Sequence, residues 1–312
     1  MLSYTVHRLK GLFFIALFVT FCSFSLMKLA PGDPALILLQ QRDAVADPVS
    51  IESARQELGL DRPFLVQYAA WLVKALQGDL GSSYYAGLSV SREIRRAFPI
   101  TLQLALCALG SAFLTALLLG LFAARREGGF PDVLTRVLSV LGTCVPSFWL
   151  ALALMFFFAV RLDLFPAVGK EGWDSFILPT AALAFGPAVF HARLLDASLK
   201  ETAEEDYVLF SRSKGLSEWQ ILIRHRLKPS LIPMLTSFGL TVGTMLGGTV
   251  IVENIFAWPG MGTLAVEAIF NRDFPMVQGY VLVMAAVYMG VNLCTDLLCA
   301  CLDPRIRTGA DS

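Results

Sequence analysis

Few residues of this sequence combine a reactive type with a spacing that could support catalysis or metal binding. The three histidines, His7, His191 and His225, are too sparse and too scattered to form a dedicated metal cage. The sequence contains no G-x-x-x-x-G-K-[ST] loop, H-E-x-x-H helix or G-x-S-x-G elbow, so it has no motif that would cradle a nucleotide phosphate or activate a nucleophile. We therefore expect no catalytic centre and no cofactor bound by this chain, and we assign no metal ligand.

The composition explains why chemistry-bearing residues are rare. Of the 312 residues, 56% are apolar and 16% are charged, with a mean hydropathy of +0.64, whereas soluble domains carry about 25% charged residues. The net charge is zero, which gives no basic surface for nucleic acid. The six cysteines show no C-x-x-C spacing and mostly fall in apolar stretches, where they are expected to pack as small membrane-core residues. The composition favours a membrane protein.

Six charge-free stretches have roughly the ~20 residues that a helix needs to cross a bilayer. They are residues 11–27, 97–124, 137–160, 175–192, 229–252 and 274–295. Six such stretches leave too little polar sequence to cover a soluble core, so we predict an all-α polytopic protein with six transmembrane helices. The first stretch also resembles a secretory signal, but it has no A-x-A site and Pro31 and Pro34 follow at once, which favours an uncleaved helix.

The distribution of Lys and Arg in the short connections predicts the orientation. One side holds fourteen of these residues and the other three, so both termini are predicted to be cytoplasmic. The resulting organisation is an N-terminal transmembrane helix (1–30), an extracytoplasmic cap (31–96), a five-helix core (97–302) with a cytoplasmic loop (193–228), and a cytoplasmic tail (303–312). Pro146, Pro179 and Pro187 should kink or break the third and fourth helices.

The two long polar regions have recognisable internal patterns. In the cap, Phe64, Tyr68 and Trp71 belong to an apolar series at helical spacing, which predicts short helices. In the cytoplasmic loop, an acidic stretch precedes Gly215. The apolar residues beyond this glycine are Leu216, Trp219, Leu222 and Ile223, whose spacing predicts a short amphipathic helix.

Polar and small residues at the edges and interior of the apolar stretches have two possible roles. Glu253 and Asn254 precede a Pro-Gly break at the outer face, where they either line a polar path or cap a helix end. Asp296 is followed by six uncharged residues and either lies near a helix end or pairs with a basic residue. Gly239, Gly243 and Gly247 form a ladder at spacing four, which predicts close helix contact within this chain or with another subunit.

Several segments together resemble one family of transport proteins. Residues 206–216 (DYVLFSRSKGL), followed by 225–233 (HRLKPSLIP), resemble the cytoplasmic coupling signature of ABC importer permeases of the dipeptide, oligopeptide and nickel family. Residues 58–63 (LGLDRP), 253–262 (ENIFAWPGMG) and 302–307 (LDPRIR) extend the resemblance over nearly the whole chain. The sequences of residues 253–262 and 270–273 (FNRD) are most similar to those of the nickel permeases of this family.

This resemblance implies a type I permease fold and a transport function without enzymatic activity of its own. It implies that the chain pairs with a second, homologous permease subunit in the cytoplasmic (inner) membrane. Two separate ABC ATPase subunits would use ATP and Mg, and an extracytoplasmic binding protein would deliver the substrate. The substrate is expected to be nickel or a nickel chelate. The alternatives are a di- or oligopeptide or an opine-type metallophore, or, in a different class, an ATPase-independent secondary transporter or channel.

The resemblance also assigns roles to individual residues. The residues expected to couple this chain to an ATPase are Asp206, Tyr207, Arg212, Lys214, Gly215, Leu216, Trp219 and His225. A separate expectation comes from the polar residues near the edges of the apolar stretches: those expected near the translocation path or its outer mouth are Glu253, Asn254, Asp273 and Asp296. The glycine turn at Gly215 would allow the following helix to seat in a cleft of the ATPase and to move as a rigid body.

Overall fold

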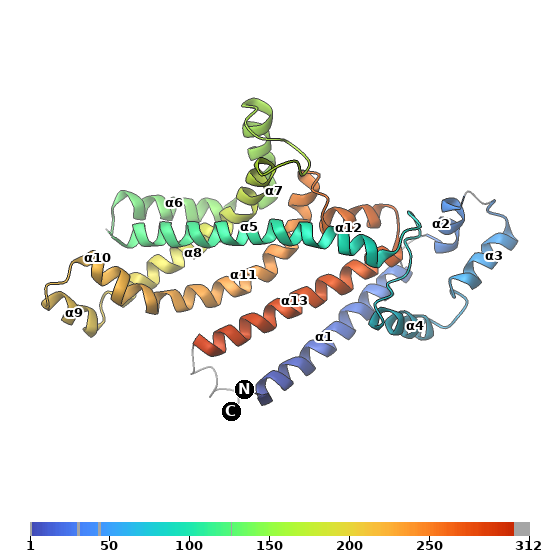
Figure 1. Cartoon of the computed structure of the whole chain (residues 1–312), viewed down its shortest axis with the longest axis horizontal. Helices are drawn as coiled ribbons and strands as arrows, with labels where there is room; N and C mark the ends of the chain where they lie inside the picture. Colours follow the sequence, from blue (N-terminus) through green and yellow to red (C-terminus); the bar gives the residue numbers. More distant parts are fainter. Residues whose placement is uncertain (1, 30–31, 43–44, 126, 303–312) are drawn as a thin grey trace. The chain divides into compact units, whose positions relative to one another are not determined.

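The computed structural model describes residues 2–29, 32–42, 45–125 and 127–302 (Figure 1). Within these ranges the chain is helical, and its only β feature is an isolated bridge between Ser82 and Ser89. The α-helices are α1 (Leu2–Leu29), α2 (Pro34–Gln41), α3 (Pro48–Glu57), α4 (Phe64–Leu76), α5 (Val90–Arg125), α6 (Phe130–Cys144), α7 (Ser147–Leu154), α8 (Ile177–Thr202), α9 (Asp206–Ser213), α10 (Glu218–Ile221), α11 (Leu227–Ile255), α12 (Met261–Phe270) and α13 (Phe274–Leu302). The prediction of an all-α fold is confirmed.

Five helical segments are long and apolar enough to cross a membrane. They are Gly11–Leu29, Val90–Arg125, Asp174–Thr202, Glu218–Ile255 and Phe274–Thr295. A sixth span results if Phe130–Cys144 and Ser147–Arg161 count as one, although these two helices are bent by 106° at their junction.

The sharp bend between α6 and α7 has a local cause in the sequence. Proline disfavours the helical conformation in the residue before it, and Val145 is indeed extended, with ψ 116°. The predicted interruption at Pro146 is therefore confirmed. Pro179 lies in the first turn of α8, where a missing N–H costs no helical hydrogen bond. Pro187 lies inside α8 without ending it.

The chain divides into two compact units. Unit 1 consists of Met1–Thr101 with Pro259–Gly290, and unit 2 consists of Leu102–Trp258 with Val291–Ser312. α5 and α13 each begin in unit 1 and end in unit 2, so the unit boundary passes through continuous helices.

In unit 1, α4 packs against the first spanning helix through aromatic side chains. The Tyr68 hydroxyl lies 2.9 Å from the Thr20 hydroxyl oxygen of α1, and this contact is buried. The rings of Phe21 and Phe24 in α1 each form edge-to-face pairs with Phe64 and Tyr68 of α4, with ring centroids 5.3–5.7 Å apart. The aromatic series that predicted α4 therefore supplies the face that binds α1.

The paired helices α2 and α3 have clear start signals. Asp33 and Asp47 accept hydrogen bonds from backbone N–H groups at the starts of α2 and α3, and a proline follows each of them at the first helical position. A small core joins the two helices; its buried residues are Ala35, Leu38, Leu39 and Ala54. The short helices that the sequence predicts in this region correspond to α2, α3 and α4.

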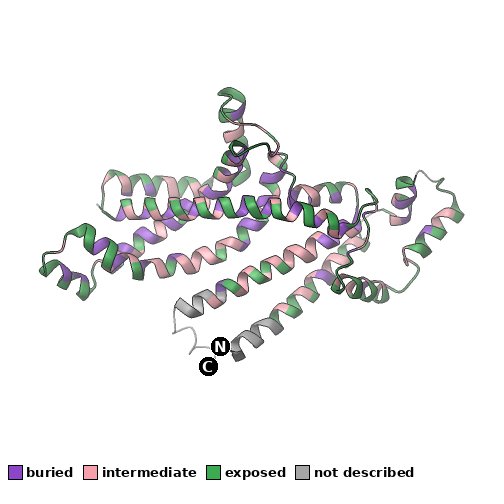
Figure 2. Cartoon of the chain, in the orientation of Figure 1, coloured by how far each residue is buried: buried purple, intermediate pink, exposed green. Residues whose placement is uncertain are grey.

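In unit 2, α8 is the central helix and packs against α6, α7 and α11. More than half of its most apolar window is buried, more than in any other candidate span, and Figure 2 shows buried residues along its length. Small residues permit this packing: a Cβ on Gly142 of α6 would lie 2.2 Å from Val189 of α8. α5, α6 and α7 in contrast expose many large apolar side chains, as a lipid-facing surface does.

Candidate coupling surface and translocation residues

The segment between α8 and α11 forms a short helical hairpin, α9–turn–α10. Gly215 has φ +77°, a conformation that side chains disfavour, and it ends α9 with its N–H donating to the Arg212 carbonyl. Ser217 and Gln220 then form a reciprocal capping box that starts α10. The Arg212 guanidinium binds both carboxylate oxygens of Glu218, with N–O distances of 2.9 and 3.3 Å, and so closes the hairpin.

The hairpin presents an apolar surface that the described part of the chain does not cover. Its exposed large side chains are Tyr207, Leu209, Phe210, Trp219 and Ile223. We call these five residues the hairpin surface. Lys214 lies over the Phe210 ring at 4.4 Å, and Arg125 lies 6.0 Å from the centroid of Trp219. Aromatic residues next to cations are typical of surfaces that bind other proteins.

The expected coupling residues divide into exposed and packed ones. Asp206, Tyr207, Arg212, Lys214, Gly215 and Trp219 are exposed, whereas Leu216 and His225 are half-buried. Leu222, expected on the same apolar face as Trp219, is instead buried in the core of unit 2 with Ile221. Leu222 is the first residue of a π-helical turn, Leu222–Arg226, which joins α10 to α11.

Side chains from the start of α11 anchor the hairpin to the end of α8. Arg226 donates two hydrogen bonds to the Leu199 carbonyl, at 3.1 and 2.5 Å, and is itself buried. Ser230 bonds the Ser198 carbonyl and the Thr202 hydroxyl. The Arg226 bonds satisfy a carbonyl in the last turn of α8, whereas the Ser198 carbonyl also accepts the Thr202 hydroxyl of the same helix. Neither residue was assigned a role from the sequence, although both lie in the 225–233 segment that resembles the family signature.

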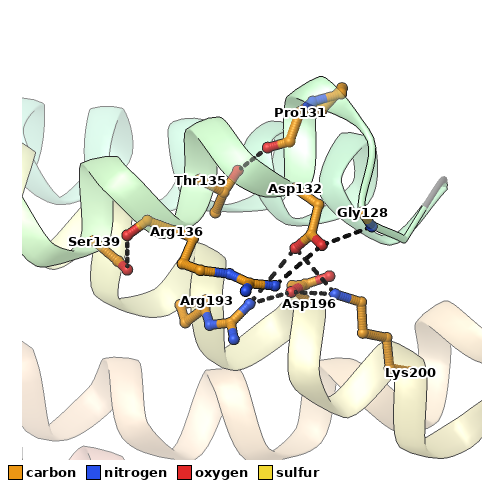
Figure 3. Close-up of polar contacts among 9 residues, drawn as sticks. All are labelled: Gly128, Pro131, Asp132, Thr135, Arg136, Ser139, Arg193, Asp196 and Lys200. Atoms are coloured by element: carbon orange, nitrogen blue, oxygen red, sulfur yellow. Dashed lines mark hydrogen bonds and ion pairs between the residues drawn. The ribbon is translucent and has the colours of Figure 1, made fainter.

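A buried charge network joins α6 to the same end of α8 (Figure 3). The Asp132 and Asp196 side chains are fully buried, and Lys200 bridges them with distances of 3.1 and 2.9 Å. Arg193 lies 2.8 Å from Asp196 and 3.7 Å from Asp132. The Gly128 N–H also donates to Asp132. The sequence analysis missed this network, although Asp196 and Lys200 have the i, i+4 spacing that favours ion pairs.

Glu253 lies in a tightly packed turn of unit 2. Its side chain is fully buried, and its carbonyl accepts the N–H of Trp258 at 2.7 Å. Trp258 is also fully buried and packs edge-to-face on Phe176 at 4.7 Å. Asn254 is exposed and donates to the Val250 carbonyl within its own helix. The structure therefore separates the two side chains: one faces the core of this turn and the other faces outward.

Asp273 lies in unit 1, where it holds a loop. One carboxylate oxygen accepts a short hydrogen bond from the Ser83 hydroxyl, and the other accepts the Tyr84 N–H at 3.1 Å. Asp273 is buried. Burial of the Tyr84 phenol, together with the charge of Asp273, raises the pKa of Tyr84 to about 12. Burial is the larger of these two causes. In this arrangement Asp273 fastens residues 83–84 to the start of α13.

The remaining predicted residues have different environments. Asp296 lies in α13, but its side chain is outside the described residues. Gly239 contacts α13 within unit 2, because a Cβ there would lie 2.2 Å from Thr295. Gly243 is buried, whereas a Cβ on Gly247 would meet no atom within 4 Å. In the glycine ladder, Gly239 therefore contacts another helix of this chain, whereas Gly247 has open space around it.

The helical fold, with five or six candidate spans, defines a multi-pass membrane protein. Residues 116–308 match the family described as the binding-protein-dependent transport system inner membrane component, and residues 1–105 match its N-terminal region. The chain belongs to this family and is a permease subunit of an ABC importer.

Full-length relatives support the same assignment. The glutathione transport system permease protein GsiC of Pectobacterium atrosepticum is 38% identical over 307 residues, which cover 98% of this chain and 99% of the relative. A Brucella abortus protein named as a candidate peptide transport system permease is 37% identical over 301 residues, 94% of this chain and 95% of its own.

Solved structures share the fold at low sequence identity. A chain of the inward-facing MetNI methionine ABC transporter aligns with a TM-score of 0.56 and 17% identity, covering 68% of this chain and 96% of its own. A chain of an amino acid ABC transporter with histidines aligns with a TM-score of 0.51 and 17% identity, covering 69% and 94%. The prediction of a type I permease fold is confirmed.

Proposed function

We propose that this chain is one of two permease subunits of an importer that carries glutathione or another small peptide across the cytoplasmic (inner) membrane. The proposed substrate rests on the names of relatives that align over nearly the whole chain. These relatives are named glutathione transport permeases and are 36–38% identical to this chain. These relatives favour a peptide as the substrate. The sequence motifs alone had suggested nickel.

The hairpin surface supports a role in energy coupling. The exposed aromatic residues of this surface are connected to the spanning helices. Arg226 and Ser230 bind the hairpin to α8, and the Asp132–Asp196 network binds α8 to α6. A partner that binds the hairpin and moves would displace the ends of three spanning segments together. We assign this partner as an ATPase subunit that uses ATP and Mg, and the chain itself binds neither.

The remaining partners follow from the family. A second, homologous permease would complete the translocation path, and a binding protein would deliver the peptide to residues 31–96 on the outer side. Both termini and the hairpin are then cytoplasmic. Glu253, Asn254, Asp273 and Asp296 stay candidate residues of the path, with Asn254 exposed and Glu253 and Asp273 buried in this conformation.

An uptake assay with two glycine variants tests this function. Cells that lack this chain would receive the wild type, Gly215→Asp or Gly169→Asp, and uptake of radiolabelled glutathione would be measured. Gly215 and Gly169 both have positive φ, and an added Cβ on either meets no atom within 4 Å, so the backbone strain is matched. Only Gly215 belongs to the hairpin. We expect Gly215→Asp to abolish uptake and peptide-stimulated ATP hydrolysis, and Gly169→Asp to preserve both.

Two results would overturn parts of the proposal. Uptake of nickel that depends on this chain and is unaffected by excess glutathione or dipeptide would show that the substrate is nickel and not a peptide. Normal peptide-stimulated ATP hydrolysis in an assembled Gly215→Asp complex would remove the coupling role from the hairpin.

A further inference from the structure

Unit 1 contains an open cavity of about 800 Å³ within the region that we propose to face outward. Its walls come from the ends of α1 and α13, from α2 to α4 and from the loop around Ser83. This volume lies within the range of about 300–1,000 Å³ that is usual for small-molecule sites. The cavity is therefore large enough for a tripeptide.

The lining carries more positive than negative charge. Among its described residues, four are basic, Lys28, Arg42, Arg62 and Lys74, and two are acidic, Glu57 and Asp79. Glu57 is already neutralised, because it accepts two hydrogen bonds from Arg42 at 2.8 and 2.7 Å.

The other basic side chains are not neutralised in this way. Within the described ranges, Lys28, Arg62 and Lys74 make no ion pair, and Lys28 contacts only the neutral amide oxygen of Gln67 at 3.2 Å. Asp79 accepts the Gly81 N–H and pairs with no described cation. Three cations thus face one unpaired carboxylate, an arrangement that attracts anions and repels free divalent metal ions.

We propose that this cavity binds the carboxylates of a small acidic peptide on its way from the binding protein to the transmembrane helices. This inference rests on the proposed peptide-import function and adds a site for the substrate on the permease itself. Arg62 and Lys74 are the principal carboxylate ligands, because charge-assisted hydrogen bonds to carboxylates are stronger than neutral ones. Phe24 and Trp71 form an aromatic part of the wall for the apolar parts of the peptide.

The substrate class follows from the charge of the lining. Glutathione has two carboxylates and one amino group, so it carries a net negative charge at neutral pH. A peptide with esterified carboxylates keeps the same backbone but loses the groups that Arg62 and Lys74 would bind. The cavity is expected to prefer the acid to the ester.

Equilibrium binding to the intact complex tests this site. The permease–ATPase complex would be reconstituted in nanodiscs without the binding protein, and binding of radiolabelled glutathione and of its diethyl ester would be measured. The variant Arg62→Gln/Lys74→Gln removes two cavity charges. We expect it to weaken glutathione binding about tenfold or more and to leave binding of the ester unchanged, since a hydrogen bond to a charged group contributes about one such factor.

A matched variant controls for net charge. Arg92→Gln/Arg95→Gln removes two exposed charges of unit 1 that do not line the cavity, and it should bind glutathione as the wild type does. Affinity of each complex for the binding protein would be measured in parallel, because these charges could instead act in docking. Equal losses in both double variants, no preference of the wild type for the acid over its ester, or a defect confined to binding-protein affinity would each overturn the site.

The outcomes separate this site from the proposed function. Import of glutathione by the wild type without binding to the isolated complex would reject the cavity and keep the function. Binding that depends on Arg62 and Lys74 without any import would keep the cavity and reject the function.

Discussion

Asp132 and Asp196 lie in an unfavourable environment for a carboxylate, since both side chains are fully buried. Burial of a charge costs several kcal/mol unless partners compensate for it. Lys200, Arg193, Arg136 and the Gly128 N–H supply that compensation here, but one oxygen of Asp196 has no partner among the described residues. Such a network makes the position of α6 against α8 sensitive to single substitutions.

Lys200→Met should therefore destabilise the protein by about 3 kcal/mol, the lower end of the range for breaking a buried ion pair, because Arg193 still faces both carboxylates. Thermal unfolding of the purified protein in detergent would report this as a lower apparent Tm. Adding Asp196→Asn should recover part of the loss, because it removes one of the two buried carboxylates that would otherwise share Arg193. A Tm equal to that of the control Arg96→Gln, which removes a charge that is 77% exposed, would contradict the role of Lys200.

At the scale of elements, regular patterns were predictable and local irregularities were not. The apolar stretches, the aromatic series of α4 and the break at Pro146 follow from hydropathy, spacing and proline geometry. The π-helical turn at Leu222–Arg226 left no such signal, and neither did the burial of Leu222 at its start. The bonds of Asp273 to Ser83 and Tyr84 join residues about 190 positions apart, and no local pattern encodes a contact of that kind.

The glycine ladder of α11 gives an element-scale prediction. Gly239→Leu should separate α11 from the end of α13, since its Cβ would lie 2.2 Å from Thr295, and overpacking of this kind costs typically about 1–3 kcal/mol. Thr295→Gly in the same chain should relieve the clash. Detergent stability of both variants would be compared by gel filtration and thermal unfolding.

Gly247→Leu separates the two roles of the ladder. Because open space surrounds this position, the isolated chain should tolerate the substitution. Loss of co-purification with the second permease would assign the open end of the ladder to a subunit interface. Normal assembly of Gly247→Leu, together with normal stability of Gly239→Leu, would count against any helix-contact role.

At the scale of the whole molecule, the charge asymmetry of the connections predicts which surfaces face which compartment. The hairpin surface and the cavity of unit 1 belong to different units, and the proposed mechanism needs them on opposite sides of the membrane. The sequence predicts this arrangement from Lys and Arg counts, and helix bounds are compatible with six crossings only if α6 and α7 together make one span.

Site-specific labelling tests this orientation. The Val45 side chain is 80% exposed. In a cysteine-free background, Val45→Cys should therefore react with a membrane-impermeant maleimide in intact cells. Glu204→Cys, next to the hairpin, should react only after permeabilisation. The opposite pattern would reverse the orientation and with it the assignment of the hairpin to an ATPase.

The bonds between the end of α8 and the start of α11 have a consequence for biosynthesis. The Leu199 carbonyl accepts two hydrogen bonds from Arg226, a residue that is synthesised 27 positions later. Ribosomes deliver the chain from its N-terminus, so α8 is made before the side chains that complete its last turn exist. A nascent chain that stops before Arg226 would carry an unfinished helix end, and quality-control proteases would meet that end in truncated products but not in the finished permease.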